Sequence, residues 1–341
     1  MSFQRFFGLC VLILFGMGAF HPPPARIPIL FICDPPERTT FISYCKVNLF
    51  LAIQSHSPYN EQMNTQSKGQ TFQNILRWSV PIAAILAFAA WMYISPEGAL
   101  GKLDAVGYAV CHRIDARSFH IGDRQLPLCA RCTGEFYAAG IALMFQAFIS
   151  RRRSKLPSRG IIAVLVLFFL AFGMDGSNSY LYLLKQSSEG ALSQIPNLYI
   201  PNNILRLFTG SGMGIALAAV LFPIVNQTLW REQDERPALE WKPFGLLIAL
   251  TLVINLLVLA DSPVVLYPIA YISALGTLSL LVIVFAILWI IIMREDNTFT
   301  STKQLILPFV SGLTLALLMI LSIDLLRLQF TGTWSGFPGL G

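Results

Sequence analysis

The chain of 341 residues is 55% hydrophobic and only 12% charged, with a formal net charge of +6 and a mean hydropathy of +0.62. This composition excludes an ordinary soluble domain of this length. The basic residues cluster between apolar runs, as in Arg151-Arg152-Arg153, a pattern that indicates orientation in a lipid bilayer and argues against nucleic-acid binding. Helices satisfy their own backbone hydrogen bonds in lipid, so the sequence predicts an all-α, polytopic membrane protein.

Residues 1–62 fit this pattern poorly. An apolar run at 6–20 is followed by a proline-rich segment and three scattered cysteines, Cys10, Cys33 and Cys45. The run has the length of a signal-peptide core or a short extra span. Alternatively, translation begins at Met63, because a short polar and basic segment follows it and leads into the first long apolar run. Residues 1–62 are therefore either a poorly ordered extension or a segment that precedes the true start.

Seven apolar runs are long enough to cross the hydrocarbon of a bilayer, which takes roughly 20 helical residues. These predicted spans lie near 79–96, 133–150, 160–184, 203–225, 243–261, 264–293 and 304–326. We expect the first four spans to form a core membrane domain at 63–225, which includes a Cys/His loop at 97–132. Residues 226–341 are expected to add three further helices and a short C-terminal tail.

Basic residues are distributed unequally between alternate loops. The loops on one side carry more Lys and Arg, including the run Arg151-Arg152-Arg153. Because basic loops tend to remain in the cytoplasm, these loops are predicted to be cytoplasmic. The protein is therefore expected to be a multi-pass protein of the cell membrane, with the loop at 97–132 on the outer side.

The loop at 97–132 holds Cys111, His112, His120, Cys129 and Cys132. A CxxC turn lets two thiolates converge on one ion, and a further Cys or His can complete a tetrahedral set. Zinc is the expected metal, because thiolate ligands suit it and it imposes no geometry of its own. His112 is next to a ligand and sterically restricted, while His120 has a freer reach. The loop is thus predicted to bind zinc through three cysteines and one of these histidines.

Two other interpretations of the same cysteines stay open. In an oxidising compartment, Cys129 and Cys132 can form a redox-active dithiol and disulfide pair, and Arg131 between them would favour the thiolate. Alternatively, the two cysteines only hold the loop together, as a disulfide or a structural zinc site. A membrane thiol oxidoreductase is therefore one alternative function, although the region after residue 62 offers only one further cysteine, Cys111.

Polar residues interrupt several spans near the predicted outer side. Ionisable groups in a bilayer are costly and therefore mark candidate functional residues. Asp175 and Asn178 share one face of the third span, Arg206 and Thr209 lie near the start of the fourth, and Glu135 begins the second. We expect Asp175 and Arg206 to pair. These residues predict a polar pocket of Asp175, Asn178, Arg206 and Thr209, with Asp175 or Glu135 as a candidate general base.

Two other features have structural interpretations. Gly210 and Gly214 have the GxxxG spacing that allows two helices to pack closely. In the second span, Gly134 and Gly140 leave room for close approach of another helix. Asp324 and Arg327 are three positions apart in the seventh span, so we expect a local pair near the membrane interface.

The order of motifs resembles an uncharacterised family of bacterial membrane proteins, known as domain of unknown function 2085. The resemblance rests on Cys111-His112-Arg113, Arg117-Ser118-Phe119, Gly122 and Pro127-Leu128-Cys129-Ala130-Arg131-Cys132-Thr133-Gly134, followed by Asp175 and by Arg206-Leu207-Phe208-Thr209-Gly210. It covers about residues 78–225. Glu135 departs from the family pattern, in which an apolar residue is usual, and the last three spans lie beyond the resemblance. The resemblance implies a bacterial membrane protein and brings no established activity.

The function expected from these residues is a zinc-binding loop above a polar pocket in the outer half of the membrane. Its chemistry, if it is an enzyme, would be metal-assisted hydrolysis or group transfer. An equal alternative is a protein that binds or transports an ion or small solute, with the metal loop as a rigid lid. No HExxH, P-loop, GxSxG or GxGxxG motif in a suitable context indicates a named enzyme class.

Overall fold

The computed structural model describes residues 58–187 and 194–335, with residues 58–74 described as backbone only. The expectations for the apolar run at 6–20 and for Cys10, Cys33 and Cys45 lie outside these residues. Two units are distinguished, 1–74 and 75–341. Helix α2 crosses this boundary, and the fold described below is that of the second unit.

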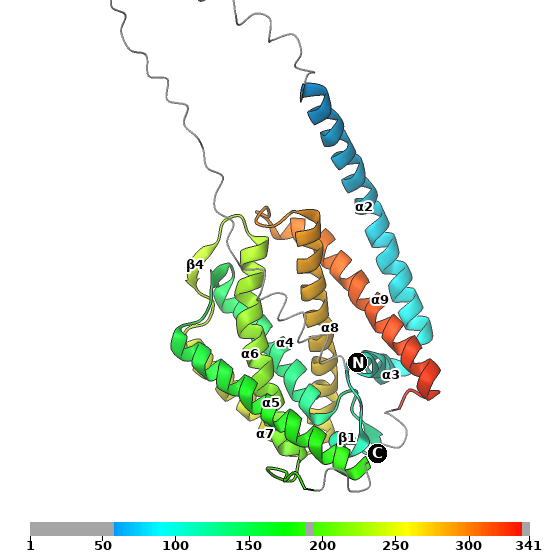
Figure 1. Ribbon diagram of the computed structural model, residues 1–341, viewed down its shortest axis with the longest axis vertical. Helices are drawn as coiled ribbons and strands as arrows, with labels where there is room; N and C mark the ends of the chain where they lie inside the picture. Colours follow the sequence, from blue (N-terminus) through cyan, green and yellow to red (C-terminus); the bar gives the residue numbers. More distant parts are fainter. Residues whose placement is uncertain (1–57, 188–193, 336–341) are drawn as a thin grey trace, which may run out of the picture. The chain divides into compact units, whose positions relative to one another are not determined.

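Eight α-helices dominate the described residues (Figure 1). They are α2 (Pro58–Ile94), α3 (Gly98–Val110), α4 (Ala130–Ser150), α5 (Arg159–Ser187), α6 (Asn203–Leu229), α7 (Trp241–Leu259), α8 (Pro263–Met293) and α9 (Ile306–Thr331), with a 3-10 turn η2 (Thr302–Leu305) before α9. All except α3 are long and apolar enough to cross a membrane. The predicted all-α fold with seven spans is therefore confirmed. Apolar side chains such as Leu167 and Leu252 are exposed on α5 and α7, as contact with lipid requires.

The segment at 97–132, expected as a loop, contains regular structure. Helix α3 is followed by the 3-10 turn η1 (Asp115–Arg117) and by an antiparallel hairpin of β1 (His120–Ile121) and β2 (Arg124–Gln125). With 13 residues, α3 is too short to cross a bilayer. It forms because one side of it is apolar, and Leu103 and Val106 pack with Leu317 and Ile320 of α9 in a buried cluster.

Helices α4 and α6 pack closely along their length, and small residues make this possible. A Cβ atom at Gly210 would collide with the backbone oxygen of Arg131, and one at Gly214 would collide with the backbone oxygen of Glu135. The close packing predicted from the GxxxG spacing is thus confirmed. Asn202 caps α6 by accepting a hydrogen bond from the Leu205 backbone N–H at 2.8 Å. The contact between Gly210 and the Arg131 backbone places the first turns of α4 and α6 side by side.

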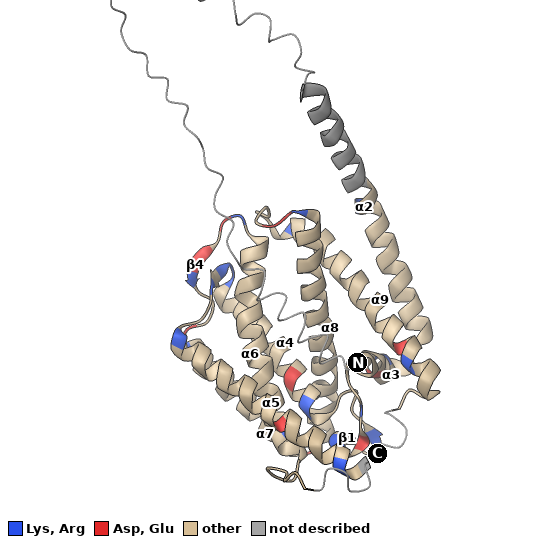
Figure 2. Ribbon diagram, in the orientation of Figure 1, with Lys and Arg blue, Asp and Glu red and all other residues tan. Residues whose placement is uncertain are grey.

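The far ends of α4 and α6 carry a second small sheet. Strand β3 (Arg153–Lys155) pairs in parallel with β4 (Asp234–Pro237). The Asn226 side chain of α6 donates to the backbone oxygens of Arg151 and Arg153, at 2.8 Å each. Figure 2 shows Lys and Arg gathered at this end of the helices as well as at the end near β1.

Candidate metal centre

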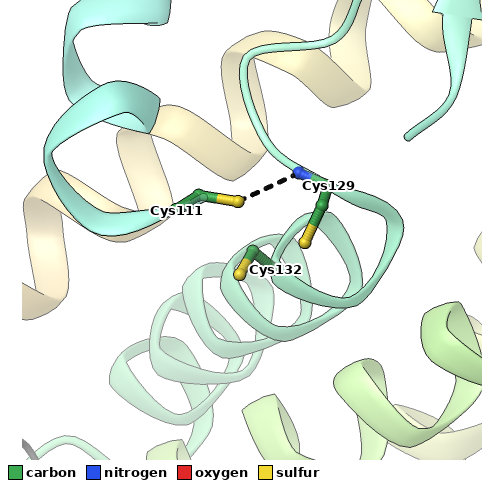
Figure 3. Close-up of side chains that lie close together, drawn as sticks. All are labelled: Cys111, Cys129 and Cys132. Carbon is green, nitrogen blue, oxygen red and sulfur yellow. Dashed lines mark hydrogen bonds between the residues drawn. The ribbon is translucent and has the colours of Figure 1, made fainter. Parts of the chain in front are cut away.

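Three cysteines from two helix ends come together. Cys111 follows the last residue of α3, Cys129 caps the start of α4, and Cys132 lies in the first turn of α4. Their Sγ atoms all lie within 4.8 Å of one another (Figure 3), and none of the three forms a disulfide. Thiolates on one tetrahedral zinc ion lie about 3.8 Å apart, given a Zn–S distance of about 2.3 Å. The three sulfurs are therefore close to the arrangement that one ion needs.

Backbone N–H groups point at the buried sulfur. The Cys129 N–H donates to the Cys111 Sγ at 3.3 Å (Figure 3), and the Arg113 N–H donates to it at 3.4 Å. Hydrogen bonds from the Cys111 and Cys132 thiols hold the pKa of the Cys129 thiol well below its usual value, and the nearby Arg131 charge adds to this effect. The shared hydrogen bond with Cys129 and burial raise the pKa of the Cys111 thiol to about 12. These contacts favour a thiolate within the cluster.

The two histidines of the loop do not join the three sulfurs. The His120 Nε2 lies 2.9 Å from the Asp115 Oδ1, at the edge of the hairpin. His112, next to Cys111, is exposed. Among the described residues, the group whose ligand atoms converge consists of the three cysteines without a histidine. The convergent group thus offers three possible ligand atoms, and the predicted fourth ligand from a histidine is not part of it.

Arg131, between the two cysteines of the CxxC motif, connects this cluster to α5. Its guanidinium forms an ion pair with Asp175, and its Nε donates to the Asp175 Oδ2 at 3.1 Å. The Asp175 carboxylate is completely buried and also accepts hydrogen bonds from the Tyr199 hydroxyl at 2.7 Å and the Thr209 hydroxyl at 3.3 Å. A neutral Tyr199 suits this role, since burial and the Asp175 carboxylate raise the pKa of its hydroxyl to about 12.

Asp175 pairs with Arg131 and not, as expected, with Arg206. The Arg206 guanidinium donates to the Asn203 Oδ1 at 2.8 Å, within the first turn of its own helix. Arg131 reaches Asp175 because the close packing at Gly210 brings the start of α4 to the same level of the bundle. The interpretation from sequence placed Asp175 at the correct level but assigned it the wrong cation.

Asn178 has a supporting position. Its amide Nδ2 donates to the Tyr199 backbone oxygen at 3.0 Å, and its Oδ1 accepts from the Leu198 N–H at 2.9 Å. These bonds fix the segment before α6, so that the Tyr199 hydroxyl reaches Asp175. Asn178 therefore has an indirect role, because it positions Tyr199, which in turn contacts Asp175.

Two arginines near the polar cluster have no described carboxylate as a direct partner. Arg117 of η1 donates to the Ser179 backbone oxygen at 3.2 Å, and burial and the neighbouring Arg131 lower the pKa of its guanidinium. Within the part of the chain that the structure describes, neither Arg117 nor Arg206 has a carboxylate within 4.0 Å. Glu135 lies one turn after Arg131, and its side chain makes no hydrogen bond to any described residue.

Arg327 of α9 has a role that sequence reasoning missed. Its guanidinium donates to the backbone oxygens of Tyr108 at 2.5 Å, Cys111 at 2.6 Å and His112 at 3.0 Å, and it lies 4.0 Å from the centre of the Tyr108 ring. The free carbonyl groups at the end of α3 are strong acceptors for such a cation. Arg327 thereby fixes the backbone that carries Cys111.

Asp104 of α3 forms ion pairs with two arginines of the loop. Its two carboxylate oxygens pair with Arg113 at 3.0 Å and with Arg124 of β2 at 2.6 Å. Burial raises the pKa of this carboxyl, and the two arginines oppose that rise. The short helix, the segment after Cys111 and the hairpin are thus tied together.

These features define a multi-pass helical membrane protein with a cluster of three cysteines at the end of its central helices. A family model described as "Predicted membrane protein (DUF2085)" matches residues 111–220, which confirms the resemblance seen in the sequence. A stretch of 131 residues is 23% identical to an uncharacterised protein of Methanocaldococcus jannaschii and covers 38% of this chain and 72% of that protein. No solved structure matches the chain. The family match contains Cys111, Cys129, Cys132, Asp175 and Arg206, and it ends within α6.

Proposed function

We propose that Cys111, Cys129 and Cys132 bind one zinc ion, and that this metal centre is the functional site of the protein. The observation that carries the proposal is the convergence of three Sγ atoms within 4.8 Å. Two backbone N–H groups directed at the Cys111 sulfur support it, because such donors stabilise a thiolate. Three thiols in one cluster favour a metal ion over a thiol oxidoreductase, since a disulfide would use only two of them.

The fourth position of the metal would be available to water, a solute or the exposed His112. Zinc sites with three protein ligands and one exchangeable ligand are typical of catalysis, where the ion polarises its ligand. Of the two candidate bases, Glu135 is the better one. The carboxylate of Asp175 is already engaged by Arg131, Tyr199 and Thr209, whereas that of Glu135 has no described hydrogen-bond partner.

The solute class that suits this site is a small anion. Three guanidinium groups, from Arg117, Arg131 and Arg206, lie near Asp175, and only that of Arg131 pairs with its carboxylate. A negatively charged solute would compensate the two arginines that have no carboxylate partner, through charge-assisted hydrogen bonds. We further propose that this end of the protein faces outward from the cell membrane. Binding or transport of such an anion is the alternative to its chemical conversion.

Metal content tests the central proposal. The purified full-length chain is expected to retain about one zinc ion per molecule, as a thiolate site of this kind does. Cys132→Ser should lose the ion, because serine keeps the size of the side chain but is a poor zinc ligand. His120→Ala is the matched control, since His120 contacts Asp115 and not the sulfurs, and it should retain the ion.

Two outcomes of this experiment would contradict the proposal. A metal-free chain with a reducible Cys129–Cys132 disulfide would indicate a thiol oxidoreductase. Loss of zinc in His120→Ala would mean that the hairpin supplies a ligand after all.

A further inference from the structure

A second candidate site lies at the opposite ends of α4 and α6. A cavity of about 800 Å³ is lined there by apolar side chains that include Ala147, Phe222 and Leu229, and by Arg151, Arg152 and Arg236. Helix α4 has 21 residues, or about 30 Å, with Cys132 in its first turn and the cavity at its last. The cavity thus belongs to a different membrane face from the metal centre and is independent of it.

Contacts with neighbouring residues hold the arginines beside this cavity in place. The Arg152 guanidinium lies 4.2 Å from the centre of the Trp230 ring and donates to the Thr300 backbone oxygen at 2.8 Å. Arg151 has a positive φ of 32°, and Asn226 holds its carbonyl group. The segment therefore keeps its side chains at the mouth of the cavity.

Two of these positive charges lack a compensating carboxylate. Arg236 pairs with Asp234 at 2.6 Å, and Arg153 pairs with Glu240 at 3.1 Å. Among the described residues, neither Arg151 nor Arg152 lies within 4.0 Å of an acidic side chain. The cavity consequently combines an apolar wall with a positively charged rim.

This combination has the chemistry of a phospholipid site. The cavity lies where two apolar spans end, so its rim is at the level of lipid headgroups and its wall is at the level of acyl chains. A soluble phosphate compound would use the arginines but gain nothing from Phe222 and Leu229, which are apolar. Basic pockets between helices on the arginine-rich side of a membrane protein bind anionic headgroups in this way.

We propose that this cavity binds an anionic phospholipid, with its phosphate at Arg151 and Arg152 and an acyl chain against Phe222 and Leu229. The lipid would bridge the ends of α4 and α6 at the leaflet that contains the Arg151-Arg152-Arg153 run. This proposal does not depend on zinc binding at the other end of α4.

Lipid retention by the full-length chain tests the proposal. The chain, purified from vesicles of equal parts phosphatidylglycerol and phosphatidylcholine, is expected to retain phosphatidylglycerol preferentially in native mass spectrometry. An Arg151→Gln, Arg152→Gln double variant should lose that preference by roughly tenfold, because each arginine near an anionic headgroup contributes about fivefold before screening. Arg159→Gln is the control, since Arg159 is an exposed arginine on the same side that does not line the cavity.

A variant that fills the cavity tests the apolar wall separately from the arginines. Ala147 is exposed at the cavity wall, so Ala147→Trp should fill the space and reduce retention of phosphatidylglycerol while the arginines stay in place. Glycerol phosphate, which has the headgroup but no acyl chain, should not displace the lipid. Unchanged retention in either variant, or full displacement by glycerol phosphate, would overturn the proposal. Zinc content should remain the same in all of these proteins.

Discussion

At the scale of single residues, Arg131 links the two parts of the candidate site. The sequence indicated the cysteines and Asp175 separately, because thiol spacing and a buried acid in a span are both local signals. The ion pair between Arg131 and Asp175 joins residues that are 44 positions apart. No local pattern specifies which of several arginines reaches Asp175. The partner of Asp175 depends on which helix ends lie side by side. The hydrogen bond from Arg327 to the Cys111 carbonyl group also depends on this packing.

Arg206 lies near Asp175 but has no carboxylate partner among the described residues, which leads to a prediction about this arginine. Arg206→Gln is expected to weaken binding of inorganic phosphate by about tenfold or more, because a charge-assisted hydrogen bond contributes more than a neutral one. Phosphate binding to the zinc-loaded, full-length chain can be measured by titration calorimetry. Arg159→Gln, a change of the same kind at an exposed position away from the site, should bind as the parent does. Equal affinity in Arg206→Gln would rule out an anion at this arginine.

At the scale of elements, the length of each apolar run predicted the seven membrane-spanning helices but did not predict the short helix α3. The seven spans are runs of about 20 or more apolar residues, so their approximate bounds follow from composition alone. Helix α3 has only 13 residues, and a search for membrane spans passes over it. Its helical form matters for the site, because the end of α3 presents Cys111 to the start of α4.

The contact between α4 and α6 sets the position of Cys129 and Cys132, so a larger residue there should affect the metal centre. Gly210→Val places a side chain against the Arg131 backbone oxygen and is expected to destabilise the fold by about 1–3 kcal/mol, the usual cost of overpacking. The variant should also retain less zinc. Gly245→Val is the control, because no atom lies within 4 Å of a Cβ at Gly245. Thermal unfolding and metal analysis would show whether the two variants differ.

At the scale of the whole molecule, α4 joins two chemically different ends. One end holds three thiols and the Arg131–Asp175 pair. The other holds the arginine-lined cavity and the small sheet of β3 and β4. Such asymmetry is expected of a protein that meets a different solution on each side of a membrane. In the orientation proposed above, the cysteines face outward, and zinc bound by them would be accessible to an external solute.

Orientation can be tested with one cysteine introduced at each end, in a chain whose Cys10, Cys33 and Cys45 are replaced by serine. Asp123 lies in the exposed turn between β1 and β2, and Glu235 lies exposed on β4. In intact cells, a membrane-impermeant thiol reagent is expected to label Asp123→Cys, and to label Glu235→Cys only after lysis. Peptide mapping would distinguish these sites from Cys111, Cys129 and Cys132. The opposite labelling pattern would place the cysteine cluster in the cytoplasm, where a reducing environment keeps thiols free and a redox role through a stable disulfide is disfavoured.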